Sequence, residues 1–260
     1  MLPELIDTHC HLDVAAFDPD RHDVVVRARE AGVRHIIVPA IARSGWEKLE
    51  GICRVDGGLH AAYGLHPVFL HDHLDSDIDA LEQRLALGGA IAVGECGLDH
   101  VIPTLDRGHQ QRLFEAQLAL ARQFDLPVIV HARRAVDAVI ACIRRVGRLR
   151  GVIHSYGGSV EQACELHRHD FMIGIGGPYT WPRSRRLHRV LREAPLDQLL
   201  LETDAPDQSD EGWRGKRNEP SRTSVIARSV ARIRNMDEGE LAVMTANNAR
   251  RLFVLPASTA

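Results

Sequence analysis

Two histidines near the amino terminus are the residues whose spacing most directly suggests chemistry. His9 and His11 stand two residues apart at the end of the short apolar run Leu5-Ile6-Asp7-Thr8-His9-Cys10-His11. In an extended strand, alternate side chains share a face, so both imidazoles project the same way, about 6.5 Å apart along the chain. This arrangement allows both rings to bind one metal ion.

Four more ionisable side chains stand at the ends of later apolar runs: Glu95, His131, His154 and Asp204. A single histidine in such a place is more often a hydrogen-bonded polar residue than a ligand. Six Asp, Glu and His side chains in equivalent places are different, since burying so many ionisable groups is costly without a cation. We therefore expect a metal site.

Four imidazoles and two carboxylates supply enough donors for two divalent ions, if one carboxylate bridges them. Mixed nitrogen and oxygen ligands suit Zn²⁺, Mn²⁺ or Fe²⁺ well and Mg²⁺ less well. Such a pair of ions would activate a water and stabilise the oxygens of a transition state, which predicts metal-assisted hydrolysis. Asp204 is expected to bind one ion and also to accept the proton of the water.

Eight apolar or β-branched runs recur along the chain with amphipathic stretches between them, and this alternation predicts the fold. The runs are 5–10, 35–40, 60–65, 90–94, 127–130, 151–153, 171–175 and 199–202, and helical spacing marks stretches such as 23–31, 107–124, 135–146 and 184–193. Strands that alternate with helices imply a parallel sheet, and eight repeats in about 260 residues favour an α/β fold closed into a (β/α)8 TIM barrel.

An open, doubly wound sheet is the competing fold. It is disfavoured because no glycine-rich phosphate-binding motif follows the first strand, and because only a barrel brings the ends of all these strands together. Residues 219–253 read as extra C-terminal helices, over 223–233 and 237–245, which we expect to pack across the outside of the barrel. A single domain spanning residues 1–260 is the predicted organisation.

Composition excludes several classes of protein. Hydrophobic residues make up 45% of the chain and charged residues 26%, as in soluble globular proteins, and neither a membrane span nor a signal peptide is apparent. We expect a cytoplasmic protein that does not bind membranes. The net charge of −3 gives no global attraction to nucleic acid, and the five cysteines form no CxxC pair that would indicate a structural zinc site.

Motifs spread over the whole chain resemble those of the TatD family of metal-dependent deoxyribonucleases and related hydrolases, within the amidohydrolase-like barrels. The matching stretches are Ile6-Asp7-Thr8-His9-Cys10-His11-Leu12-Asp13, Gly64-Leu65-His66-Pro67, Gly94-Glu95-Cys96-Gly97-Leu98-Asp99, Leu126-Pro127-Val128-Ile129-Val130-His131, His154-Ser155-Tyr156-Gly157-Gly158, Leu201-Glu202-Thr203-Asp204-Ala205-Pro206, Arg217-Asn218-Glu219-Pro220 and Asn247-Asn248-Ala249-Arg250-Arg251-Leu252-Phe253.

The resemblance implies a role for each ligand. His9, His11 and Asp204 would bind one ion, and Glu95 would bridge it to a second ion held by His131 and His154. His66 matches a family site position and would touch the scissile group without being a steady ligand. The family usually has an aromatic residue in place of His100 and Ser-Arg-Asp in place of Ala132-Arg133-Arg134. These departures remove no ligand and bear on the substrate.

Local basic residues are the remaining clue to the substrate. Arg133, two residues after His131, is the best candidate for a phosphate clamp. One group, Arg183, Arg185, Arg186, Arg189 and Arg192, is typical of an exposed helix face, whereas Arg214, Lys216, Arg217 and Arg222 follow the last strand and favour phosphate binding. Tyr179, Trp181 and Trp213 lie in the same loops, where they would either stack on bases or pack the loops.

Two functions remain open, together with a disfavoured third. The first is a divalent-metal-dependent phosphodiesterase, a deoxyribonuclease acting on DNA ends or single strands. The second is an amidohydrolase that cleaves a C–N or ester bond of a small molecule or an aminoacyl adduct, for which the same ions would serve. A non-catalytic binding protein is disfavoured because every expected ligand is present.

Overall fold

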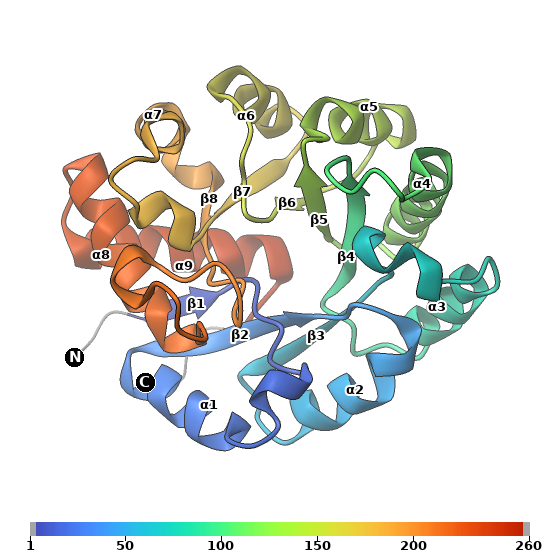
Figure 1. The fold of residues 1–260 in the computed structure, drawn as a ribbon, viewed down its shortest axis with the longest axis horizontal. Coiled ribbons are helices and arrows are strands. Elements are labelled where there is room, and N and C mark those ends of the chain that lie inside the picture. The colour runs from blue at the N-terminus through green and yellow to red at the C-terminus, as the bar shows by residue number, and fades with distance from the viewer. Residues whose placement is uncertain (1–3, 257–260) are drawn as a thin grey trace.

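The strands form one parallel sheet in sequence order, from β1 to β8, in a computed structural model that describes residues 4–256 (Figure 1). The strands are β1 Leu5–Asp7, β2 Val33–Pro39, β3 Leu59–Tyr63, β4 Ala92–Asp99, β5 Val128–Arg133, β6 Gly151–Ile153, β7 Phe171–Ile175 and β8 Leu199–Leu201. The helices around them are α1 Arg21–Glu30, α2 Trp46–Arg54, α3 Asp77–Ala86, α4 Arg107–Gln123, α5 Val136–Val146, α6 Val160–His167, α7 Arg185–Glu193, α8 Thr223–Arg234 and α9 Glu238–Phe253. The predicted eight-stranded barrel with extra C-terminal helices is confirmed.

The barrel closes where the segments after β1 and β8 meet. The Thr8 N–H donates to the Leu201 carbonyl at 3.0 Å, the Asp204 N–H to the His9 carbonyl at 2.8 Å, and the His11 N–H to the Ala205 carbonyl at 2.8 Å. These hydrogen bonds continue the ladder past the ends of the short strands. They set the first histidine pair directly beside Asp204.

The inside of the barrel holds a layer of apolar side chains to which every strand contributes one residue. This layer consists of Ile6, Ile37, Ala62, Ala92, Ile129, Val152, Met172 and Leu200. Because these side chains fill the interior, the barrel is a packed core rather than a channel. Polar side chains that follow the strands can therefore gather only at an end of the barrel.

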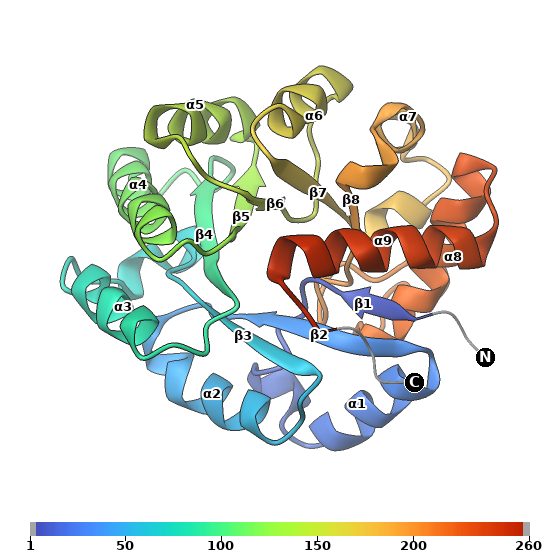
Figure 2. The same cartoon turned by 180° about the vertical axis from the view of Figure 1, so that it is seen from behind.

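Helix α9 covers the end of the barrel where the strands begin (Figure 2). Its Ala246, Ala249, Leu252 and Phe253 pack on the inner apolar layer, and Asn248 donates to the Leu196 and Leu199 carbonyls at 2.8 and 2.9 Å. The expectation that both C-terminal helices pack on the outside is wrong for α9, because its apolar face is buried against the barrel interior. The polar side chains that follow the strands can therefore gather only at the opposite end of the barrel.

Among the described residues, no helix combines the length and the apolar character that a membrane crossing requires.

Candidate metal centre

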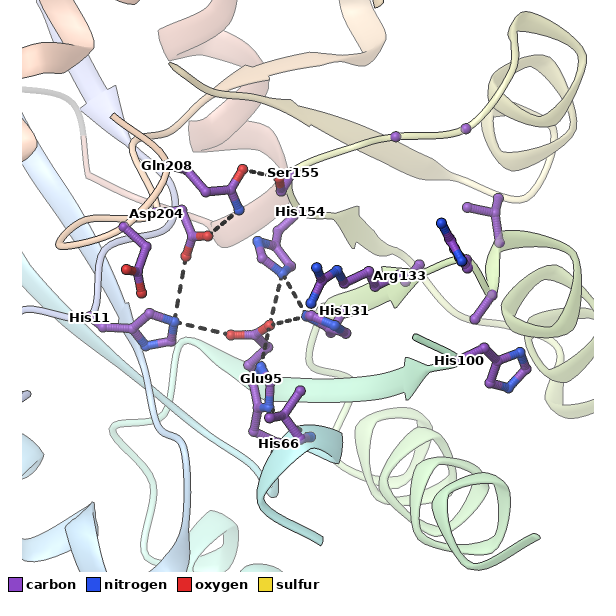
Figure 3. Close-up of a pocket in the computed structure, with 18 of the residues that line it drawn as sticks. His11, His66, Glu95, His100, His131, Arg133, His154, Ser155, Asp204 and Gln208 are labelled. Atoms are coloured by element: carbon purple, nitrogen blue, oxygen red, sulfur yellow. Dashed lines mark hydrogen bonds and ion pairs between the residues drawn. The ribbon is translucent and has the colours of Figure 1, made fainter. Parts of the chain in front are cut away.

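His9 and His11 follow β1 in extended backbone, and their rings point at the same atoms, as their spacing predicts. The two Nε2 atoms lie 3.2 Å apart, and they lie 3.1 and 3.3 Å from Glu95 Oε2. Asp204 Oδ1 completes the group at 3.5 Å from His9 Nε2 and 3.6 Å from His11 Nε2, and Figure 3 shows the contact with His11. Ligands about 2.1 Å from a tetrahedral ion lie about 3.4 Å apart, so these four atoms have the spacing of a metal site.

A second group of donors surrounds the other oxygen of Glu95. His154 Nε2 lies 2.8 Å and His131 Nδ1 lies 3.0 Å from Glu95 Oε1, and the two nitrogens are 3.3 Å apart. Each oxygen of Glu95 therefore faces a different set of imidazoles. This is the arrangement expected of a carboxylate that bridges two ions.

His66 also approaches Glu95 Oε1, at 3.0 Å, so proximity alone does not choose between His66 and His154 as a ligand. Hydrogen bonding distinguishes them. The Val68 N–H donates to His66 Nδ1 at 3.1 Å, which places the proton of the neutral His66 ring on Nε2. His66 Nε2 is thus a hydrogen-bond donor to Glu95 Oε1, whereas no described residue hydrogen-bonds to His154 Nδ1, so this nitrogen can hold the proton of the neutral ring and leave the Nε2 lone pair for a metal.

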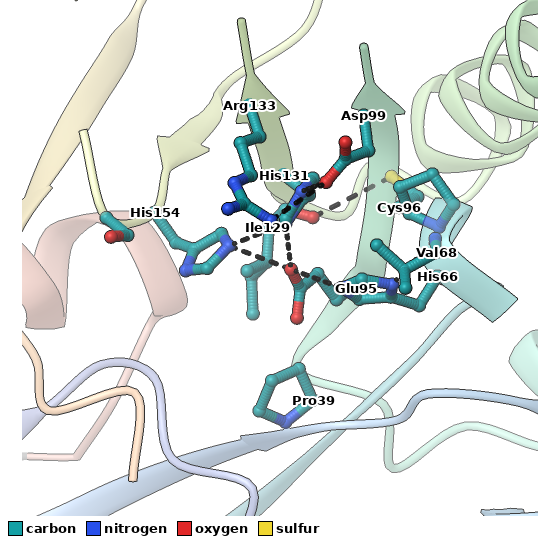
Figure 4. Close-up of polar contacts among 12 residues, drawn as sticks. Pro39, His66, Val68, Glu95, Cys96, Asp99, Ile129, His131, Arg133 and His154 are labelled. Carbon is teal, nitrogen blue, oxygen red and sulfur yellow. Dashed lines mark hydrogen bonds and ion pairs between the residues drawn. The ribbon is translucent and has the colours of Figure 1, made fainter. Parts of the chain in front are cut away.

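Asp99, the last residue of β4, fixes the ring of His131 (Figure 4). His131 Nε2 lies 3.0 Å from Asp99 Oδ2, so donation from Nε2 leaves the lone pair of Nδ1 facing Glu95. Burial opposes ionisation of Asp99, but the hydrogen bonds from His131 and from the Val101 N–H lower the pKa of its carboxyl to about 2. A carboxylate that orients a ligand imidazole in this way is common in metal sites.

The buried polar atoms of the centre fit a cation. Glu95 is fully buried, and its Oε2 accepts no hydrogen bond from any described residue despite the two nearby imidazoles. Burial opposes charge on Glu95, but the imidazoles of His154, His66 and His9 hold the pKa of its carboxyl well below the usual value. Four imidazoles and two carboxylates packed this closely are the donor set that divalent zinc or manganese accepts.

Gln208 links the two ligand groups through Ser155. Its Nε2 donates to Asp204 Oδ2, and its Oε1 accepts from the Ser155 hydroxyl at 2.6 Å (Figure 3). Ser155 directly follows His154, and its backbone N–H donates to Glu202 Oε1 at 2.5 Å. Glu202 and Gln208, which flank Asp204 in the segment after β8, therefore both hydrogen-bond to Ser155 in the segment after β6.

A cavity of about 1270 Å³ opens at this end of the barrel. Its wall includes His11, His66, Glu95, His131, His154 and Asp204, so every expected ligand except His9 lines it. Arg133 also lines the cavity, and its guanidinium nitrogen lies 4.0 Å from Asp99 Oδ2. The predicted site residues thus lie together at one end of the barrel.

The basic residues in the loop after β8 lie outside this cavity. Arg217 pairs with Asp20 at 2.7 Å and Arg222 pairs with Asp210 at 2.7 Å, and Lys216 stacks over the Trp213 ring at 4.1 Å. Within residues 4–256, the cavity wall includes none of the group Arg214, Lys216, Arg217 and Arg222. Arg217 ties the loop to the segment before α1, and Arg222 and Lys216 make contacts within the loop, so their placement gives no support to phosphate binding.

The aromatic residues near these loops also serve packing. Tyr179 is 1% exposed and its hydroxyl donates to the Tyr156 carbonyl at 2.8 Å, so of the two alternatives, base stacking and loop packing, its burial fits loop packing. Trp181 and Trp213 donate from their indole nitrogens to the Ser209 and Arg217 carbonyls. Of the arginines expected on an exposed helix face, Arg186 does line the cavity.

Three residues of the site were not singled out from the sequence: Asp99, Glu202 and Gln208. Asp99 and Glu202 lie within stretches that resemble the family motifs, four residues after Glu95 and two residues before Asp204. This closeness to expected ligands is the feature of the sequence that could have identified them. Burial raises the pKa of the Glu202 carboxyl to about 8. Gln208 carried no signal, because its role depends on the fold of the loop after β8.

The sequence and fold match those of known metal-dependent hydrolases. The protein family described as TatD related DNase matches residues 6–254. The chain is 38% identical over 259 residues to the uncharacterized metal-dependent hydrolase YjjV of Escherichia coli strain K12, covering 98% of this chain and 100% of that relative. It is 34% identical over 251 residues to the uncharacterized metal-dependent hydrolase YabD of Bacillus subtilis strain 168, covering 96% and 98%. The crystal structure of YJJV, a TatD homolog from Escherichia coli K12, gives a TM-score of 0.94 at 37% identity, covering 98% and 100%.

Proposed function

Because this chain belongs to the TatD family of metal-dependent hydrolases, we propose that it is a deoxyribonuclease that cleaves phosphodiester bonds in single-stranded DNA or at DNA ends. Two divalent ions would be held in its centre, the first by His9, His11 and Asp204 and the second by His131 and His154, with Glu95 between them. When bound, such ions supply an activated water and positive charge for the oxygens of the scissile group.

The observation that carries the proposal is the position of Arg133. Its side chain is 61% exposed, lines the same cavity as the candidate ligands, and lies near Asp99, which holds His131. A guanidinium here can donate two hydrogen bonds to the non-bridging oxygens of a phosphodiester. A neutral amide or ester has no such charge, so the cation favours a phosphate substrate over the amidohydrolase alternative.

Two side chains are placed to act on the substrate beside Arg133. Asp204 Oδ2 keeps a lone pair besides the one that accepts from Gln208, and this oxygen is proposed to accept the proton of the attacking water. His66 lines the cavity with its Nε2 N–H 3.0 Å from Glu95 Oε1, and it is proposed to contact an oxygen of the scissile group that binds beside Glu95. Asp99 keeps His131 in the tautomer that a ligand requires.

A substrate panel tests the proposal. Protein stripped of metal and reconstituted with Zn²⁺, Mn²⁺ or Mg²⁺ is assayed against single-stranded DNA and a set of small-molecule amides and carboxylic esters. We expect metal-dependent cleavage of DNA and little turnover of the others. Turnover of an amide or ester in the absence of DNA cleavage would instead establish the amidohydrolase.

A further inference from the structure

The cavity extends well beyond the candidate ligands. On one side it runs past Arg133 to His100, which lies farther from Glu95 (Figure 3). Its outer wall is built by the segments after β5 and β6 and by the start of α7, and it includes Arg134, Gly157 and Arg186. This part of the cavity is separate from the atoms that would hold the ions.

The outer part of the cavity is positively charged. Arg134 and Arg186 form no ion pair with any described residue, and Arg186 donates to the Gly157 carbonyl at 2.5 Å. Asp137 is the carboxylate on this wall, and its Oδ1 already accepts from Gln162 Nε2 at 2.6 Å. By contrast, Arg189 on the same helix pairs with Glu193 at 2.8 Å and lies outside the cavity wall.

The size of the cavity indicates a substrate larger than one small molecule. Its volume of about 1270 Å³ exceeds the range of roughly 300–1,000 Å³ that suits a drug-sized ligand. A substrate that reaches from the ligand groups to Arg134 and Arg186 would match these cations best with a second anionic group. A phosphodiester chain meets both requirements, because its negative charges repeat along its length.

We propose that Arg134 and Arg186 bind a phosphate adjacent to the scissile one, so that the preferred substrate is an oligonucleotide with at least two phosphates. The inference rests on the proposed phosphodiesterase function and adds a second phosphate subsite to it. Arg133 serves the scissile phosphate, while Arg134 and Arg186 serve its neighbour. Substrates with a single phosphodiester would gain nothing from the outer pair.

Two substitutions with matched controls test the subsite. Arg134→Ala is compared with Arg148→Ala, since both residues are exposed, flank α5 and have the same left-handed backbone, with φ of 52° and 53°. Arg186→Ala is compared with Arg189→Ala on the same helix. The shared backbone conformation means that strain introduced by alanine is equal in the first pair.

Two measurements are made on each metal-loaded protein. Binding of a fluorescent, hydrolysis-resistant phosphorothioate (dT)4 is followed by anisotropy at several salt concentrations. Hydrolysis of bis(p-nitrophenyl) phosphate, which has one phosphodiester and no neighbouring phosphate, is followed by absorbance. We expect Arg134→Ala and Arg186→Ala each to weaken oligonucleotide binding about 3–10-fold. The slope of log K against log salt should become shallower by about 0.7 for each lost contact.

The small diester distinguishes the outer subsite from the catalytic centre. Its kcat/KM should stay at the wild-type value in both test variants, and both controls should bind the oligonucleotide normally. Unchanged oligonucleotide binding, or an equal loss on the small diester, would overturn the subsite. If the wild-type protein cleaves no phosphodiester at all, the proposed function fails, and the binding data alone decide whether the outer cations recognise phosphate.

Discussion

Replacing Asp99 with asparagine should weaken one metal site selectively. Asp99 Oδ2 accepts from His131 Nε2 at 3.0 Å, which leaves His131 Nδ1 free to face Glu95 and His154. An asparagine amide presents N–H groups to His131 Nε2 and favours the tautomer with its proton on Nδ1. That proton removes the lone pair that the second ion requires.

The expected loss of metal affinity follows from the contact of Asp99 with the ring nitrogen of His131 that does not face Glu95. Loss of such an orienting carboxylate typically lowers metal affinity by about 10–100-fold, or about 1.4–2.7 kcal/mol. The first site should be spared, because its nitrogens belong to His9 and His11 and do not contact Asp99. The asparagine oxygen can keep the hydrogen bonds from the Val101 and Ile102 N–H groups, so the turn after β4 should survive.

Calorimetric titration of the metal-free protein with Mn²⁺ measures both binding constants. Asp137→Asn is the matched control, since Asp137 is a cavity carboxylate that contacts no histidine of the centre. Thermal melting of the metal-free variants shows whether Asp99→Asn disturbs the fold. Two unchanged constants in a well-folded Asp99→Asn protein would refute the assignment of Asp99 as the residue that orients His131.

Four further results are expected. Glu95→Gln should reduce the number of tightly held ions measured by metal analysis, because it removes the charge that allows two cations to lie close together; an unchanged count would exclude bridging. Asp204→Asn should retain metal but lower kcat by about 10²–10⁴-fold, and near-normal kcat would exclude its proton-acceptor role. Arg133→Ala should chiefly raise KM on an oligonucleotide, and unaltered kinetics there would favour a non-phosphate substrate. Metal affinity should fall as pH falls. Burial opposes protonation of His11 and His154, but the contacts and charge of Glu95 raise the pKa of these imidazoles to about 9 and about 10, so the metal must displace protons. Titration at several pH values checks this, and a pH-independent affinity would contradict it.

The barrel and the convergence of the ligands could be predicted because both depend on local patterns. Buried parallel strands read as short apolar runs, and the residue after each run lies at the same end of the sheet. The site could therefore be predicted from the spacing of His9 and His11 and from the position of Glu95, His131, His154 and Asp204 at the ends of apolar runs. No knowledge of side-chain packing was required.

The features that escaped prediction depend on partners distant in the sequence. The sequence alone identifies no ion-pair partner for Arg217 or Arg222, but in the fold they pair with Asp20 and Asp210. Helix α9 has the same amphipathic pattern whether it covers the outer surface or the barrel end, so its position follows from the inner layer it meets.

Isotope labelling of the cleavage product tests the central claim most directly. Metal-reconstituted protein is incubated with single-stranded DNA in water enriched in ¹⁸O, and the products are weighed by mass spectrometry. Hydrolysis at phosphorus predicts one ¹⁸O atom on the phosphate end created by each cut, and no cleavage after metal removal. Intact DNA in the presence of bound metal, or cleavage without ¹⁸O in the new phosphate end, would contradict a metal-dependent phosphodiesterase.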